Sequence, residues 1–291
     1  MLLTSSSPAQ LVAAQIFGQM LRSRYAASVI RFAGFRSASQ SPGQPDQSAP
    51  AYGLDSQLLQ VAPAASAIEA PTVLQSWNKL SLGSRDLTMI DVSSNMAREV
   101  DPGGPSYEYE LTKAAAIGLS LFADSADLGL WEYGHDLNGS RPYKQLVSVG
   151  PLPAQVGVLS RRDQLEHIAA NLTAGTSPAV DLYGSILDGY QYMQKTYQPN
   201  YFNGVVVLGS GIENAPGDIT ATELLKKLNK LSNPARKVVV IIIAFGNPPN
   251  FPQLQRIAQA TGGEAYEISK PSQVDEVFYQ ALAHRLCSPG C

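Results

Sequence analysis

A carboxylate and several oxygen-bearing side chains follow one apolar run of the sequence at close spacing. The run Leu87–Ile90 leads directly into Asp91, and Ser93, Ser94 and Asn95 come within the next four residues. A carboxylate, hydroxyls and an amide carbonyl on one tight turn are oxygen ligands that suit a hard cation such as Mg²⁺. The spacing therefore predicts a candidate magnesium site, and the alternative is a serine-rich helix cap that only satisfies backbone amides.

Other reactive residue types lack the spacing that their chemistry needs. The three histidines are far apart and are accompanied by no paired histidine or cysteine spacing, which argues against a zinc site. The glycine turn Gly209–Gly211 lacks the phosphate-loop pattern, and Ser93 does not stand in a Gly-x-Ser-x-Gly sequence. Asp181 is expected to cap a helix, and Asp188 to lie on the polar face of that helix. We therefore expect no enzymatic activity.

The elements that must position Asp91 alternate between short β-rich runs and amphipathic helices. Strands are expected at Leu87–Ile90, Leu128–Tyr133, Val205–Leu208 and Lys237–Ala244. Apolar stripes at helical spacing are formed by Leu111, Ala114, Gly118 and Leu121, by Leu182, Ile186, Tyr190 and Met193, and by Val274, Val277, Phe278 and Ala281, and a further helix is expected from Phe251 to Ala260. This alternation predicts an α/β fold with a doubly wound, mostly parallel sheet. Ligands of such sheets lie at the carboxyl ends of the strands, where Asp91 falls.

The first third of the chain has a different character. Apolar residues at helical spacing predict a helical segment from Pro8 to about Phe32, with a break near Ser23. A stretch rich in Ser, Pro and Ala follows, which cannot bury a core. We divide the chain into a helical segment (1–36), a linker (37–72), the α/β domain (73–286) and a cysteine-containing tail (287–291), and expect Trp77 to anchor the α/β domain by packing.

Composition and charge exclude several classes of function. A formal net charge of −3, with no long run of Lys or Arg, gives no footprint for nucleic acid. The longest apolar run, Val238–Phe245, is too short to cross a bilayer, and the first eight residues lack the features of a signal peptide. Membrane attachment would therefore come only through sequence upstream. Cys287 and Cys291 could pair in an oxidising compartment or remain free, as terminal cysteines often do.

The stretch Ile90–Met96 resembles the metal-ion-dependent adhesion site of von Willebrand factor A domains, whose pattern is Asp-x-Ser-x-Ser. Other stretches are similar to the C-terminal domain of actinobacterial extracytoplasmic proteins that join a solute-binding domain to a von Willebrand factor A domain: Gly129–Tyr133, Leu146–Leu152, Gly175-Thr176, Leu182-Tyr183, Val205–Leu208 and Ile257–Tyr266. Leu21–Ser23 and Ala33–Arg36 resemble the last helix of such a solute-binding domain, whose lobes would be missing here. The resemblance implies the Rossmann-like von Willebrand factor A fold.

The chain departs from the family pattern at two positions of the adhesion site. Asn95 stands where the pattern has its second Ser, and Ser210 stands where the family's Thr-Asp-Gly sequence supplies a second carboxylate. Thr176 or Ser177 matches the family's separate threonine ligand. The resemblance thus implies a degenerate ion site formed by Asp91, Ser93, Asn95, Thr176 and Ser210. Loss of one negative charge should weaken Mg²⁺ binding, because Mg²⁺ gives up its water reluctantly.

The same resemblance implies an adhesion-type protein-interaction module that binds a protein partner at the carboxyl edge of the sheet, with Mg²⁺ as its only cofactor. It also implies an extracytoplasmic or cell-surface location, as part of a solute-binding protein. Two alternatives stay open. One is a cytoplasmic von Willebrand factor A domain that works with a nucleotide-driven motor subunit, and the other is a structural domain that binds no ion.

Overall fold

The computed structural model describes residues 8–32, 82–139, 141–270, 273–274, 276–277 and 279–281. The chain divides into two compact units, Met1–Glu69 and Ala70–Cys291, and each is described by itself. The predicted linker, Trp77, Phe278 and both cysteines lie outside the described residues. No helix among the residues that the structure describes is long and apolar enough to cross a membrane.

The described residues of the first unit form helices α1 (Pro8–Leu21) and α2 (Arg24–Phe32). They are separated by a turn at Arg22 and Ser23. The Ser23 hydroxyl oxygen accepts a hydrogen bond from the backbone N–H of Ala26 at 3.1 Å, which satisfies one of the free amides at the start of α2. The predicted helical segment and its break near Ser23 are therefore confirmed.

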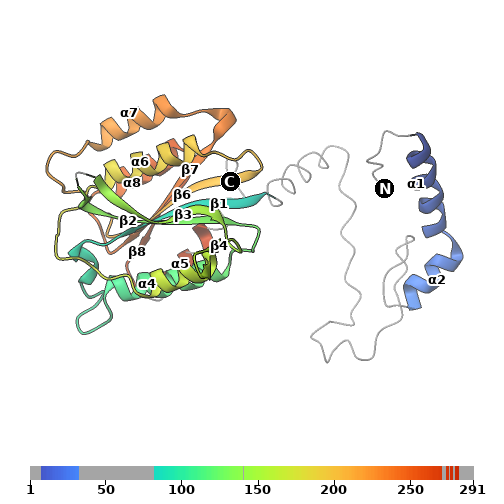
Figure 1. Cartoon of the computed structure of the whole chain (residues 1–291), viewed down its shortest axis with the longest axis horizontal. Helices are drawn as coiled ribbons and strands as arrows, with labels where there is room; N and C mark the ends of the chain where they lie inside the picture. Colours follow the sequence, from blue (N-terminus) through green and yellow to red (C-terminus); the bar gives the residue numbers. More distant parts are fainter. Residues whose placement is uncertain are drawn as a thin grey trace. The chain divides into compact units, whose positions relative to one another are not determined.

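The second unit is built on a six-stranded sheet in the order β3-β2-β1-β6-β7-β8 (Figure 1). The strands are β1 (Gly83–Asp91), β2 (Asp127–Asn138), β3 (Arg141–Pro151), β6 (Tyr201–Gly209), β7 (Val238–Phe245) and β8 (Ala265–Ile268). Every neighbouring pair is parallel except β2 and β3, which form an antiparallel pair at one edge. The predicted mostly parallel sheet is confirmed, and β3 and β8 extend it beyond the four predicted strands.

Helices cover both faces of this sheet. Figure 1 shows α6 (Leu182–Lys195), α7 (Ala221–Leu231) and α8 (Phe251–Ala260) on one face, and α4 (Tyr107–Ser120) and α5 (Arg161–Ala170) on the other. The remaining short elements are η2 (Ser94–Ala97), β4 (Gln155–Val156), β5 (Leu159–Ser160) and η3 (Pro234–Arg236). This arrangement is the doubly wound architecture that the alternating sequence pattern predicts.

Strand β7, which lies between β6 and β8, shows why its sequence has no polar alternation. All eight of its residues are buried, because both faces of the sheet are covered. Val240 and Ile242 belong to the core beneath α6, α7 and α8, whereas Ile241 and Ile243 belong to the core beneath α4 and α5. Val274, Val277 and Ala281, three residues of the last predicted helix face, are also buried in that second core.

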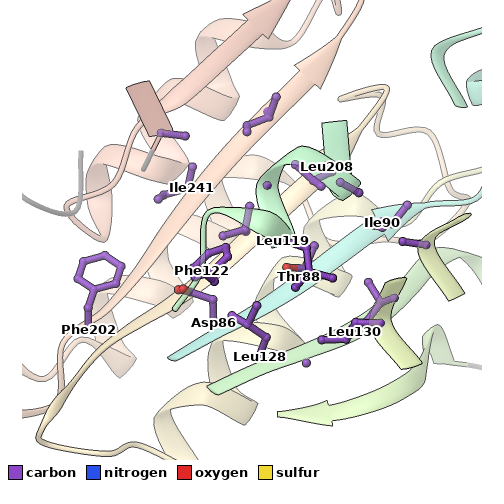
Figure 2. Close-up of a pocket in the computed structure, with 18 residues that line it drawn as sticks. Asp86, Thr88, Ile90, Leu119, Phe122, Leu128, Leu130, Phe202, Leu208 and Ile241 are labelled. Carbon is purple, nitrogen blue, oxygen red and sulfur yellow. The ribbon is translucent and has the colours of Figure 1, made fainter. Parts of the chain in front are cut away.

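A small cavity of about 100 Å³ remains between the sheet and helices α4 and α5 (Figure 2). Its wall is formed mainly by apolar side chains, among them Leu119, Phe122 and Leu128. Asp86 is the charged residue in the described lining, and its carboxylate accepts a hydrogen bond from the Ser84 hydroxyl. Ligand pockets carry several convergent polar groups, whereas the described lining of this cavity is mainly apolar. The cavity is therefore not the candidate functional site.

Candidate functional site

The candidate site forms where β1 and β6 end side by side. These strands are parallel neighbours, and Ile90 pairs with Leu208, so the next residues along each strand meet at the carboxyl edge of the sheet. The Asp91 carboxylate accepts hydrogen bonds from the Ser93 N–H at 2.8 Å, the Ser210 N–H at 3.0 Å and the Ser210 hydroxyl at 2.6 Å. Asp91, Ser93 and Ser210 are all buried, so these bonds replace the water that Asp91 has lost.

Asn95, in η2, links this turn to the loop before α6. Its amide nitrogen Nδ2 donates to the Ser93 hydroxyl oxygen at 3.2 Å and to the Pro178 carbonyl at 2.9 Å. A carbonyl oxygen can only accept hydrogen bonds, so the end of the Asn95 amide that faces the Pro178 carbonyl must be its NH₂ group. The position at which the sequence predicts an oxygen ligand therefore presents an N–H donor instead.

Thr176 lies on the loop that closes over the Asp91 turn. Gly175 N–H donates to the Val92 carbonyl at 2.7 Å, and Ser94 N–H donates to the Ser177 carbonyl at 2.9 Å, so backbone bonds hold Thr176 in place from both sides. Its side chain is exposed. The structure thus brings all five predicted ligands to one edge of the sheet, although Thr176 belongs to the rim and the others to the hydrogen-bonded turn.

The donors and acceptors of this turn do not fit Mg²⁺ in the conformation described. A magnesium ion needs near-octahedral oxygen ligands at about 2.0–2.1 Å. The single carboxylate, Asp91, already accepts three hydrogen bonds, the Ser210 hydroxyl donates to it, and Asn95 turns its nitrogen toward Ser93. Neutral donors therefore stabilise the negative charge of Asp91. Ligation of Mg²⁺ by these residues stays a prediction, and it would require this network to rearrange.

Gly209, the last residue of β6, makes the close approach of the two strands possible. A Cβ atom at this position would collide with the Tyr133 hydroxyl and with the Cβ atom of Asp91, so a larger residue would separate β6 from its neighbours. Burial raises the pKa of Tyr133 well above its ordinary value, and the charges of Asp91 and Glu213 raise it further. The tyrosine therefore stays neutral beneath the turn.

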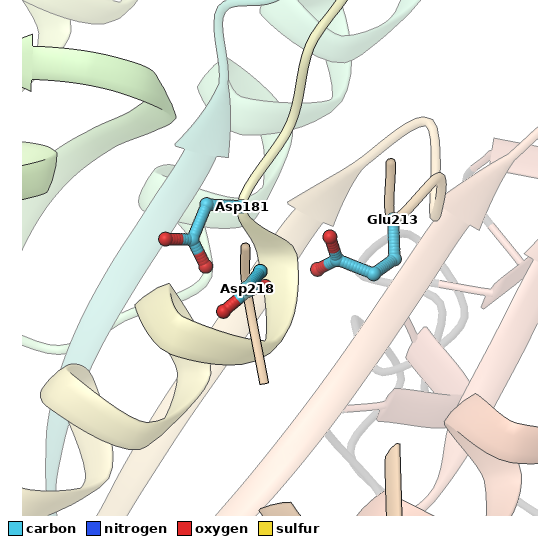
Figure 3. A group of neighbouring side chains, drawn as sticks. All are labelled: Asp181, Glu213 and Asp218. Atoms are coloured by element: carbon cyan, nitrogen blue, oxygen red, sulfur yellow. The ribbon is translucent and has the colours of Figure 1, made fainter. Parts of the chain in front are cut away.

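A second group of polar residues gathers at the start of α6, on the same edge of the sheet (Figure 3). Asp181, Glu213 and Asp218 each offer a carboxylate oxygen, and these three oxygens lie within 4.8 Å of one another. Figure 3 shows the Glu213 carboxylate directed toward the two aspartates. Burial, aided by Asp218, raises the pKa of Asp181 to about 8 and that of Glu213 to about 8. Three oxygens at this spacing could hold a cation, or they can share protons.

Sequence reasoning identified one member of this cluster and missed two. The predicted cap is confirmed, because Asp181 Oδ1 accepts from the Gly184 N–H at 2.9 Å. Glu213 and Asp218 were overlooked, although they stand in the loop after the central strand β6, where ligands of such sheets are expected. Asp188, also placed correctly on α6, is partly exposed.

Sequence comparison finds relatives for part of the chain. No family model matches the chain. Two uncharacterised proteins of Mycobacterium tuberculosis, from strains CDC 1551 and H37Rv, are each 26% identical over 196 residues, which cover 65% of this chain and 28% of theirs. The chain therefore spans less than a third of the length of the curated relatives that it matches.

Solved structures identify the fold of the second unit. A von Willebrand factor type A protein from Catenulispora acidiphila superposes with a TM-score of 0.50 and 15% identity, covering 71% of this chain and 43% of that protein. Proximal thread matrix protein 1 from the mussel byssus gives a TM-score of 0.50 and 15% identity, covering 70% of this chain and 47% of that protein. The second unit thus has the von Willebrand factor A fold that the Asp-x-Ser-x-Asn turn predicts.

Proposed function

We propose that the domain is a protein-interaction module without catalytic activity, and that it contacts its partner through the loops at the carboxyl edge of the sheet. The observation that carries this proposal is the set of hydrogen bonds that tie those loops together. Ser94 bonds to Ser177, and Asn95 bonds to Pro178, so the turn after β1 and the loop before α6 form one preorganised surface. A surface that is already ordered loses less conformational entropy when a partner binds.

The chemistry of the same turn supports the absence of catalysis. The Ser210 hydroxyl donates directly to the Asp91 carboxylate, so its proton is held by a buried and hydrogen-bonded acceptor. A serine nucleophile is normally activated by a histidine that stands between the serine and the carboxylate, whereas Ser210 in the described part of the chain bonds to Asp91 directly. The serine and carboxylate therefore serve as a structural pair in this proposal.

We further propose that the domain belongs to an extracytoplasmic or cell-surface solute-binding protein. The location and the solute-binding role rest on the sequence resemblance, and two observations support the narrower idea that the domain is part of a longer protein. The curated relatives are much longer than the matched region, which covers 28% of their length. Helix α1 carries Val12, Ile16 and Met20 on its surface, each more than half exposed, and such an apolar row suits packing against another domain.

The proposal of an interaction edge is tested by site-specific photocrosslinking. A benzophenone amino acid is placed at Thr176, on the rim of the edge, and separately at Val158, which is 96% exposed. Val158 lies after β3, whose last residue Pro151 pairs with Asp127 at the start of β2, so it marks the opposite edge of the sheet. Both variants of the 291-residue chain are irradiated with extracts of the source cells.

We expect one protein adduct to form at position 176 and to disappear when excess unlabelled chain competes for the partner. Position 158 should give no such adduct. Equal labelling at the two positions, or labelling that competitor does not reduce, would contradict an interaction surface at the carboxyl edge.

A further inference from the structure

A pocket of about 210 Å³ opens beside Ser210 at the carboxyl edge of the sheet. Its walls come from η2, the start of α4 and the residues that follow β6 and β7, and they include Asn95, Arg98, Tyr107, Phe245 and Asn247. The rings of Tyr107 and Phe245 meet edge to face, with centroids 6.4 Å apart. The pocket therefore combines an aromatic wall with the amide side chains of Asn95 and Asn247.

Arg98 is the charged side chain in the described lining of this pocket. Its backbone is held firmly, because its N–H donates to the Asn95 carbonyl at 3.4 Å and its carbonyl accepts from the Tyr107 N–H at 3.0 Å. Among the residues that the structure describes, no hydrogen bond or ion pair is found for its guanidinium group. The neighbouring Glu99 is directed elsewhere, since its carboxylate accepts from the Gly103 N–H at 2.8 Å.

Asp91, the carboxylate that bonds to Ser210 beside this pocket, already has hydrogen-bond partners. Asp91 is buried and accepts three hydrogen bonds from Ser93 and Ser210, and the ion pairs found among the described residues do not include one between Asp91 and Arg98. The pocket consequently presents one permanent positive charge, with neutral hydrogen-bonding side chains around it. A guanidinium group matches a carboxylate in shape and charge, and it can donate two parallel hydrogen bonds to it.

We propose that this pocket receives an Asp or Glu side chain of the protein partner, and that Arg98 binds the carboxylate directly, without a metal ion. This inference rests on the proposed interaction edge and deepens it by naming the chemistry of the partner residue. The methylene groups of the acidic side chain pack against the aromatic wall, and Asn247 borders the bound carboxylate.

The test uses small probes, so that it does not depend on knowing the partner. The ¹⁵N-labelled full chain is titrated in EDTA with N-acetyl-glutamate N-methylamide, and in parallel with the uncharged N-acetyl-glutamine N-methylamide. We expect saturable shifts of the Arg98 guanidinium N–H and Ser210 amide signals with the glutamate probe. The glutamine probe should bind at least about tenfold more weakly, because the charge-assisted pair is lost.

Three variants make the assignment specific. Arg98→Gln should abolish the shifts at Ser210, and Arg98→Lys should retain weaker binding, since a lysine keeps the charge but not the paired donors. Arg256→Gln removes the same charge from an exposed position on α8 and should leave the titration unchanged. Retained folding of each variant is read from the dispersion of the remaining amide signals.

Several outcomes would overturn the inference. They are equal binding of the two probes, unchanged binding by Arg98→Gln, absence of any shift up to high millimolar concentrations, and binding that appears only when Mg²⁺ replaces EDTA. If the Thr176 crosslink forms while the glutamate probe fails, the edge is an interface that does not use Arg98 for a carboxylate. If no crosslink forms at position 176, the proposed function is contradicted, whatever the glutamate probe shows.

Discussion

The carboxylate cluster at the start of α6 makes stability depend on pH in a direction that can be worked out. The pKa values of Asp181 and Glu213 rise to about 8 in the folded protein, from ordinary values of 3.8 and 4.5. Between roughly pH 4 and pH 8 the folded state therefore keeps protons that the unfolded chain releases. Stability is greatest at the acidic end of this window and falls as the pH rises through it.

Asp181→Asn should remove much of this dependence. The side-chain oxygen of asparagine can still accept from the Gly184 N–H, as Asp181 does at 2.9 Å, and its amide nitrogen can donate toward Asp218 as a protonated Asp181 would. One retained proton changes the free energy of unfolding by about 1.4 kcal/mol per pH unit. The cluster is partly exposed and its protons are shared, so we expect solvent screening to reduce the total to about 1–2 kcal/mol.

The measurement is thermal and urea unfolding from pH 5 to pH 8.5. Asp181→Asn should match the wild type near pH 5 and unfold about 4 °C higher at pH 8.5, given the usual relation between stability and Tm for a domain of this size. Asp101→Asn is the matched control, because it removes the same charge from an exposed turn. Parallel pH profiles for wild type and Asp181→Asn, or a variant that is less stable at pH 8.5, would refute the reasoning.

Three further predictions concern the Asp91 turn and the core. Isothermal titration of the chelator-treated wild type should show no saturable Mg²⁺ binding, whereas the double variant Asn95→Ser/Ser210→Asp should bind the ion. If the wild type does bind Mg²⁺ and Asp91→Ala abolishes that binding, the predicted adhesion-type site is correct. Asp91→Ala should also lower the free energy of unfolding by about 3 kcal/mol, because it leaves buried donors of Ser93 and Ser210 without an acceptor. A Tm within one degree of that of the wild type would contradict this hydrogen-bond network. Ile186→Ala, at a fully buried position of α6, should cost about 2–5 kcal/mol in urea unfolding, and a loss below 1 kcal/mol would show that the site is less tightly packed than described.

The sequence alone predicted most of the sheet, because burial leaves a strong local signal. The unbroken apolar run of β7 indicates a strand covered on both faces, and the stripe of α6 indicates one buried helix face. The sequence analysis did not predict β3 or α5, because their local burial signal is weak. The edge strand β3 is exposed or half-buried at most positions, and α5 begins with three charged residues and buries Leu165 and Ala169 as its apolar contacts.

At the site, the sequence determined which residue types follow the strands, and the tertiary structure decided what those residues do. Asp91 and Ser210 are separated by 119 positions and meet only because β1 and β6 pair in parallel, so their ends share one edge. Whether a side chain donates or accepts a hydrogen bond depends on the group that faces it. The Asn95 amide nitrogen donates to the Pro178 carbonyl, and Asp91 accepts a hydrogen bond from the Ser210 hydroxyl. Oxygen-rich residues that suggested a cation site therefore form a network of neutral donors around one carboxylate. Residue type sets what a side chain is able to donate or accept, and only its three-dimensional neighbours determine which of these it does.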